Sequence, residues 1–202
     1  MRKTVLILLL ACAVCAGGFA QSAEDYINSG TLYLSVDNYD RAIVEFTEAI
    51  KLNPRIAEAY AGRGGAYIQK KDYDKAIADF TEAIKLNPKY TIVYNLRGKA
   101  YYEKENYDKA IADFTEVIKL DSKYIEAYNL RGKAYFEKDN YDKAIADFTE
   151  VIKLDPKHAM AYLYRALAYS GKKDNAKAAA DLKEAMRLDP NIADIVAEII
   201  KG

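Results

Sequence analysis

The chain has 202 residues with 30 basic and 30 acidic side chains, so its formal net charge is zero. Lysines are interleaved with acids along its length, which excludes the basic face expected of a nucleic-acid-binding protein. Both cysteines, Cys12 and Cys15, lie near the N-terminus, so the rest of the chain forms no disulfide and offers no thiolate to a metal.

Residues 1–20 have the layout of a secretory signal peptide. Two basic residues precede an apolar run, and the small residues Gly18 and Ala20 form a cleavage site before Gln21. The apolar run is short compared with the ~20 residues that a bilayer-spanning helix needs, so we expect cleavage rather than an uncleaved anchor. Removal of this segment takes away two basic residues and leaves 28 basic against 30 acidic side chains.

The same segment also offers a lipidation site. Leu9-Leu10-Ala11-Cys12 loosely resembles a bacterial lipobox with Cys12 as the acylated residue, although a leucine directly before the alanine is unusual. The sequence therefore predicts an exported protein, periplasmic or secreted, and leaves a membrane-anchored lipoprotein as the alternative.

Beyond residue 22 the chain repeats at a strict interval without insertions, which predicts a repeat array. Prolines recur at one position of the repeat, and Ser122 takes that position in the third copy. The third and fourth copies differ at only 7 of 34 positions. The copies span residues 23–56, 57–90, 91–124, 125–158 and 159–192.

Each copy has the pattern of two helices. In the third copy Tyr94, Gly98 and Tyr101 share one face of a first helix. The second helix presents one apolar stripe, which consists of Ala110, Phe114, Val117 and Leu120. We expect the glycine to face the alanine, so that the two backbones approach closely and the aromatic rings fill the space beside them.

The ends of the second helices carry recognisable signals. Good N-cap residues precede them in every copy: Asn38, Asp72, Asn106, Asn140 and Asp174. The second helix ends at Leu-Asn-Pro or Leu-Asp-Pro in most copies, because the residue before proline is disfavoured in helical geometry. Each copy is therefore predicted to be a helix-turn-helix hairpin.

These residues resemble the tetratricopeptide repeat, or TPR, which has an aromatic residue at position 4, then glycine, tyrosine, alanine, phenylalanine and proline at set spacings. The resemblance covers residues 23–192 and implies an all-α fold, a right-handed superhelical solenoid of helix-turn-helix hairpins. The sequence departs from the family pattern in three ways. Tyrosine replaces tryptophan, Ser122 replaces proline, and arginine replaces leucine at the seventh position.

The arginine at the seventh position has two interpretations. It recurs in copies two to five, as Arg63, Arg97, Arg131 and Arg165. It could bind a ligand, or it could pair with the aspartate on the second helix of the same copy, as Asp79 follows Arg63. We favour the ion pair, because a guanidinium commonly forks onto a carboxylate.

The family resemblance implies a concave groove lined by the first helices, where a peptide or protein partner binds. Carried onto this chain, the candidate partner-binding residues are Asn95, Lys99, Tyr102, Asn129, Lys133 and Phe136. The asparagines would form a ladder that grips an extended backbone, the lysines would attract a carboxylate, and the aromatic rings would add apolar surface. Alternatively, these residues recur only because the copies are duplicates.

Residues 193–202 are predicted to form a C-terminal capping helix over the last copy. Their apolar positions, Ile195, Val196, Ile199 and Ile200, lie on one stripe of a helix. Self-association through apolar residues at the two ends of the array is a further hypothesis.

The sequence offers no catalytic constellation, cofactor motif or metal-ligand cluster, so we expect neither an enzyme nor a cofactor. Its lone histidine, His158, lies between two copies and has no partner motif. The leading hypothesis is a non-catalytic interaction scaffold that binds a peptide or protein segment in the groove after export. The alternative is a lipoprotein structural subunit of a bacterial envelope or outer-membrane assembly complex.

Overall fold

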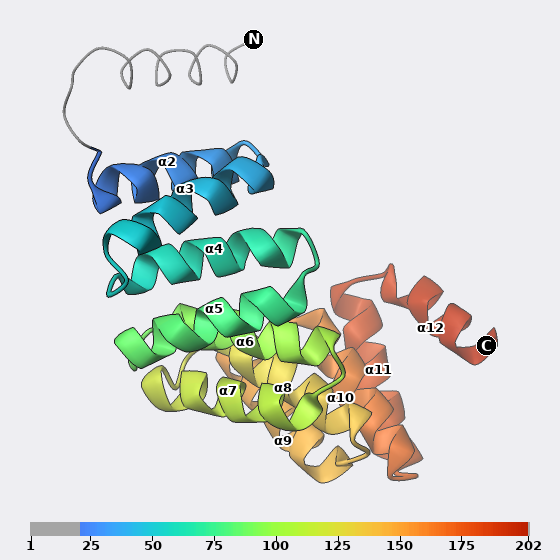
Figure 1. Ribbon diagram of the computed structural model, residues 1–202. Coiled ribbons are helices and arrows are strands. Elements are labelled where there is room, and N and C mark those ends of the chain that lie inside the picture. The colour runs from blue at the N-terminus through green and yellow to red at the C-terminus, as the bar shows by residue number, and fades with distance from the viewer. Residues whose placement is uncertain (1–20, 202) are drawn as a thin grey trace. The chain divides into compact units, whose positions relative to one another are not determined.

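The computed structural model describes residues 21–201, which form eleven α-helices and no strand (Figure 1). The signal segment and Cys12 lie outside the described residues. The chain divides into two compact units between Pro88 and Lys89, and each is described by itself. None of the described helices has the length and apolar content needed to span a bilayer.

The first unit contains two helical hairpins, α2/α3 and α4/α5, and α3 also packs on α4. Their bounds are α2 Ala23–Ser35, α3 Tyr39–Leu52, α4 Ala57–Gln69 and α5 Tyr73–Leu86. Each second helix buries an alanine, a phenylalanine and another alanine, such as Ala42, Phe46 and Ala49 in α3.

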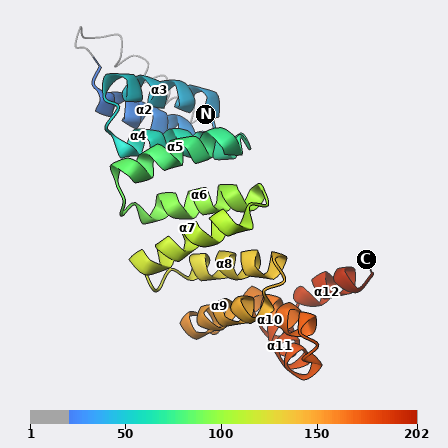
Figure 2. The ribbon, with the colours of Figure 1, turned by 60° about the horizontal axis from the view of Figure 1, so that its bottom comes forward.

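The second unit contains three hairpins and a terminal helix, as Figure 2 shows. The helices are α6 Thr91–Glu103, α7 Tyr107–Leu120, α8 Ile125–Glu137, α9 Tyr141–Leu154, α10 Ala159–Gly171, α11 Asn175–Leu188 and α12 Ile192–Lys201. Neighbouring hairpins contact one another through α7 with α8 and α9 with α10. The helix pairs predicted from the repeat pattern are confirmed.

Both ends of the turn inside each hairpin are closed by hydrogen bonds. The predicted N-caps are confirmed; for example, Asn38 Oδ1 accepts from the backbone N–H of Arg41 at 3.2 Å. Before the cap, the backbone N–H of Asn38 donates to the carbonyl of Tyr33, and that of Asp37 to Leu34, which is a Schellman motif. The residue at the left-handed position of this turn is never glycine: Asp37, Lys71, Glu105, Asp139 and Lys173.

The apolar stripe of the second helix is narrower than predicted. Ala110, Phe114 and Val117 are completely buried in α7, whereas Leu120 is 40% exposed. Leu120 lies at the end of the predicted stripe and is exposed because α7 ends at this residue and the following aspartate leaves the helix.

In the first four hairpins the glycine on the first helix faces a phenylalanine ring of the second helix. A Cβ atom on Gly98 would lie 2.7 Å from Cε1 of Phe114, and the glycines of the other hairpins that carry phenylalanine are equally crowded. In the fifth hairpin alanine replaces this glycine, at Ala166, and Leu182 replaces the phenylalanine. The methyl group is tolerated there because the ring is absent.

A half-buried arginine recurs in hairpins two to five, and at Arg131 it connects three helices. Arg131 donates from Nε and Nη2 to both carboxylate oxygens of Asp147, at 2.9 and 2.7 Å. Its Nη1 donates at 3.0 Å to the hydroxyl of Thr115, which belongs to the preceding hairpin. We call this set of arginine, aspartate and threonine the arginine clamp. The predicted pair within each repeat is confirmed for Arg63, Arg97, Arg131 and Arg165.

Two tyrosines flank the clamp. The guanidinium carbon of Arg131 lies 5.7 Å from the ring centre of Tyr128 and 6.0 Å from that of Tyr135. These are the repeated tyrosines at positions 4 and 11, so their rings shield the charge and add cation–π attraction. Burial raises the pKa of the Asp147 carboxyl, and the hydrogen bonds from Arg131 oppose that rise.

Among the described side chains of the C-terminal helix α12, Ile192 and Val196 attach it to the last hairpin. Ile192 is completely buried against Leu163 and Ala185, and Val196 packs on the same cluster. Ile195, predicted to cover the last hairpin, is instead 38% exposed. Figure 2 shows α12 extending away from α10 and α11. Ile192, the first residue of this helix, lies before the predicted cap.

The crowding between glycine and phenylalanine yields a stability prediction. Gly98→Ala should lose about 1–3 kcal/mol through overpacking, partly offset by about 1 kcal/mol of helix propensity. Phe114→Leu alone should destabilise by opening a cavity. The double variant should lose less unfolding free energy than the two single variants together, by about 1 kcal/mol or more, because the smaller leucine leaves room for the methyl group of alanine. Urea unfolding of the four proteins measures this coupling, and strictly additive changes would refute the account.

The arginine clamp yields a second prediction. Arg131→Met leaves the Asp147 carboxylate buried without its partner and should cost about 3–5 kcal/mol of unfolding free energy. Replacing both, with Arg131→Met and Asp147→Leu, should recover much of this loss because no buried charge remains.

Arg187→Met is the matched control, because Arg187 forms a comparable pair with Glu184 that is exposed to solvent. Thermal melting followed by circular dichroism should show a large shift for Arg131→Met and little change for Arg187→Met. Similar melting temperatures for the two variants would contradict a structural role of the clamp.

Candidate functional site

The six predicted partner-binding residues lie on the first helices of two consecutive hairpins, α6 and α8, in the second unit. Asn95, Lys99 and Tyr102 succeed one another by about one turn along α6, and their counterparts on α8 are Asn129, Lys133 and Phe136. Because α6 and α8 contact each other, the two sets share one face, which we call the first-helix face.

The structure joins Asn95 and Lys99 through the carboxylate of Glu126. Nδ2 of Asn95 donates to Oε2 of Glu126 at 2.8 Å, and Nζ of Lys99 donates to Oε1 of the same carboxylate at 2.7 Å. Glu126 lies in the first turn of α8 and is half exposed. The sequence gave no signal of this pairing, because Glu126 belongs to the next repeat and is distant from Lys99 along the chain.

The aromatic members of the set pack against their own hairpins. Tyr102 meets the ring of Tyr107 edge-on at 5.3 Å, and Phe136 meets Tyr141 at 5.6 Å. The Tyr102 hydroxyl also donates to Glu137 at 3.4 Å. Burial, reinforced by the nearby Glu137 carboxylate, raises the pKa of Tyr102 far above its usual value, so this hydroxyl stays protonated. Both rings are therefore partly buried and present less free surface than the sequence suggested.

Lys133 is placed differently from Lys99. Its ammonium nitrogen lies 4.3 Å from the ring centre of Tyr164 on α10. The ring of Tyr164 also stacks on Phe148 with centres 5.6 Å apart. Sequence reasoning missed Tyr164, although a signal existed: it replaces Leu130 at the sixth position of the repeat.

The amide oxygens of Asn95 and Asn129 share an unusual feature. Both are buried without a hydrogen-bond partner. An unpaired buried acceptor costs about 1–3 kcal/mol, so this arrangement is unfavourable for packing alone. The atom that remains for other contacts is the amide nitrogen, which Asn95 donates to Glu126.

The apolar residues predicted at the ends of the array are partly covered. Ile27 and Leu34 pack against the core of the first hairpin, and Leu163 is only 2% exposed beneath Ile192. His158, the lone histidine, is a helix N-cap whose Nδ1 accepts from the backbone N–H of Ala161 at 3.2 Å. Among residues 21–201 no cluster of three histidine, cysteine or acidic side chains is arranged to hold a metal.

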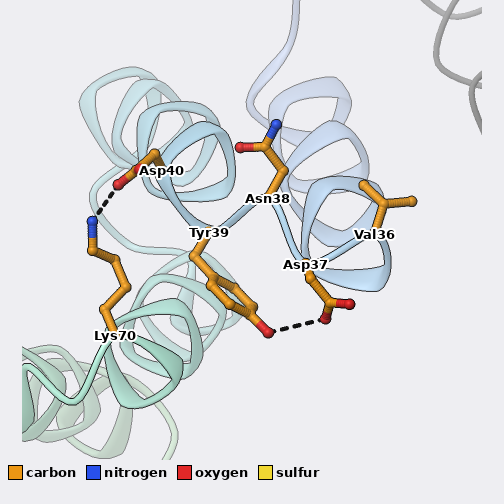
Figure 3. A pocket seen from close by; sticks show the side chains of 6 residues that line it. All are labelled: Val36, Asp37, Asn38, Tyr39, Asp40 and Lys70. Carbon is orange, nitrogen blue, oxygen red and sulfur yellow. Dashed lines mark hydrogen bonds and ion pairs between the residues drawn. The ribbon is translucent and has the colours of Figure 1, made fainter.

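An open hollow lies at the turn of the first hairpin (Figure 3). Figure 3 shows Tyr39 directed toward Asp37, to which its hydroxyl donates at 2.9 Å, and Lys70 paired with Asp40. The same two contacts recur in the fourth hairpin and at its junction with the fifth, where a tyrosine–aspartate and a lysine–aspartate pair stand at the equivalent positions. The hollow is thus a repeated structural feature of the turns, and its polar groups are already engaged.

Comparisons with known proteins agree with this geometry. Tetratricopeptide repeat models match residues 24–56, 57–90, 98–139, 125–158 and 159–192. Comparison with curated protein sequences gives no match.

Among solved structures, the chain is similar to YrrB, described as a TPR protein with an unusual peptide-binding site. The two are 26% identical, with a TM-score of 0.78 over 84% of this chain and 88% of YrrB. A crystal structure of MamA is 25% identical, with a TM-score of 0.78 over 82% of this chain and 96% of MamA. MamA from Desulfovibrio magneticus RS-1 shares the fold at 22% identity, with a TM-score of 0.80 over 85% of this chain and 97% of that one.

The predicted all-α fold of tandem hairpins is confirmed by these neighbours and by the described helices. The repeat models cover most of the residues that the structure describes, and the chain belongs to the tetratricopeptide repeat family.

Proposed function

We propose that this protein is a non-catalytic scaffold that binds a peptide or protein segment on the first-helix face of α6 and α8. The observation that carries the proposal is the pair of asparagines at equivalent positions of two consecutive hairpins. Each buries its amide oxygen without a partner, so the amide nitrogen is the donor that remains. The nitrogen of Asn95 holds Glu126, and that of Asn129 has no partner among the described residues. Two hairpins bear the same unfavourable arrangement at the same position, and this favours recognition over packing as its cause.

The surroundings of the asparagines suit an extended segment. Lysines lie one turn further along both helices, and the rings of Tyr102 and Phe136 follow. Ammonium groups attract acidic partners, and aromatic rings are enriched where protein surfaces meet. The likeness to YrrB, a TPR protein with a peptide-binding site, supports a peptide ligand for this chain.

The proposal places the protein outside the cytoplasm and gives it no catalytic step. Export rests on residues 1–20, whose basic start, apolar run and small residues match a secretory signal. The one histidine is used as a helix cap, and the buried aspartates are held by arginines. Acylation at Cys12 would instead favour a structural subunit of an envelope assembly.

The scaffold proposal predicts that a display library of random peptides contains ligands for the purified protein. The double replacement Asn129→Ala with Lys133→Ala should weaken the selected peptides about tenfold or more, which corresponds to about 1.4 kcal/mol. Lys153→Ala is the matched control, because this lysine is exposed on α9, away from the first-helix face. A library without ligands, or ligands indifferent to the double replacement, would refute the proposal.

Export is tested separately by expressing the full chain, fractionating the cells and taking an intact mass of the product. A soluble exported protein that begins at Gln21 is the expected result. A membrane-bound product that begins with acylated Cys12 would instead favour the envelope-subunit hypothesis. A full-length cytoplasmic product would refute both hypotheses.

A further inference from the structure

Two equivalent pairs of side chains on the first-helix face differ in what they hold. Asn95 and Lys99, one helical turn apart on α6, together bind the carboxylate of Glu126 from the next hairpin. The amide nitrogen takes one oxygen at 2.8 Å and the ammonium takes the other at 2.7 Å. This arrangement binds both oxygens of a carboxylate with two donors of different kinds.

The second pair lacks such a carboxylate. Asn129 and Lys133 occupy the same positions on α8, one repeat later, but Met160 stands where Glu126 stands for the first pair. Within residues 21–201, Asn129 makes no side-chain hydrogen bond and Lys133 makes no ion pair. Glu137, which follows Lys133 on the same helix, accepts a hydrogen bond from the hydroxyl of Tyr102 on α6 instead.

We propose that Asn129 and Lys133 form an open carboxylate-binding site, which a partner peptide fills through an acidic side chain or its terminal carboxylate. Glu126 is the internal template for the ligand, because it shows how the same two residue types hold such a group one hairpin earlier. The inference deepens the proposed function by naming the ligand chemistry. The role of this site in partner binding rests on the proposed scaffold function, whereas its affinity for a carboxylate does not.

The contact with Tyr164 does not satisfy Lys133. An ammonium carries three N–H donors, and a ring face attracts the charge without accepting all of them. Because Tyr164 also stacks on Phe148, the ring stays in place and holds the ammonium on this face. Met160, which takes the place of Glu126 in the next hairpin, is partly buried and by this equivalence gives the site an apolar neighbour. A ligand with a carboxylate next to an apolar group therefore fits best.

The test is a nuclear magnetic resonance titration of the ¹⁵N-labelled protein purified from expression of the full chain. Three probes are used at constant ionic strength: N-acetylglycine, N-acetylglutamate α-amide and uncharged N-acetylglutamine α-amide. The first carries a terminal carboxylate and the second a side-chain carboxylate, so they distinguish the two sources. We expect a saturable shift of the Asn129 side-chain amide with at least one acid, no comparable shift of Asn95, and no effect of the neutral probe.

Matched variants decide the assignment. Lys133→Met should weaken the response about tenfold or more. Lys153→Met should leave it unchanged, because Lys153 is exposed on the second helix α9. Glu126→Ala should expose the first pair and make the Asn95 amide respond to the same acids. No saturable shift at Asn129, or an equal response to the neutral probe, would overturn the inference. If the titration gives this negative result but the peptide library yields ligands, the scaffold function remains supported and only the carboxylate site is refuted.

Discussion

The arginine clamp is the interaction on which the arrangement of the hairpins depends. One guanidinium joins the first and second helices of its own hairpin through aspartate and reaches the preceding hairpin through threonine. Its planar set of donors can make these contacts at once, which a lysine could not. Burial of the pair adds little net stability, because desolvation opposes the attraction between the charges. Within each unit, the clamp instead sets the register between consecutive hairpins, since any slip would leave charges buried without partners.

The two helices of a hairpin approach closely because of the residue sizes at their contact. Glycine leaves room for a phenylalanine ring inside each hairpin, and the ring then fills the core that the small alanines leave open. In the fifth hairpin both members are exchanged together, with Ala166 at the glycine position and Leu182 at the phenylalanine position. Tyrosines at positions 4 and 11 cover the clamp on either side. Each of these repeated residues therefore has a contact that accounts for it.

Much of the fold could be predicted because the period, the N-caps and the arginine–aspartate spacing are local signals that recur in most copies. The left-handed turn residues could not, since Asp37 occupies a position where glycine is the usual signal. The sequence predicted which residues form the candidate site but not the hydrogen bonds and ion pairs that they make. Asn95 and Asn129 stand at equivalent positions of consecutive copies, so the sequence alone treats them as equal rungs. Glu126 and Met160, which belong to the following hairpins, make them unequal, and duplicated helices thus acquire different contacts from their neighbours.

The first hairpin lacks the clamp, because Ser29 replaces the arginine and Glu45 stands where the paired aspartate would be. Burial raises the pKa of Glu45, and no guanidinium reaches its carboxylate from α2. Meanwhile α2 carries its own capping box, in which Ser22 and Asp25 exchange hydrogen bonds. In the first unit α2 is therefore the first helix that no clamp joins to its partner, so α2 should detach from α3 at a smaller free-energy cost than α4 from α5, and its amide hydrogens should exchange earlier.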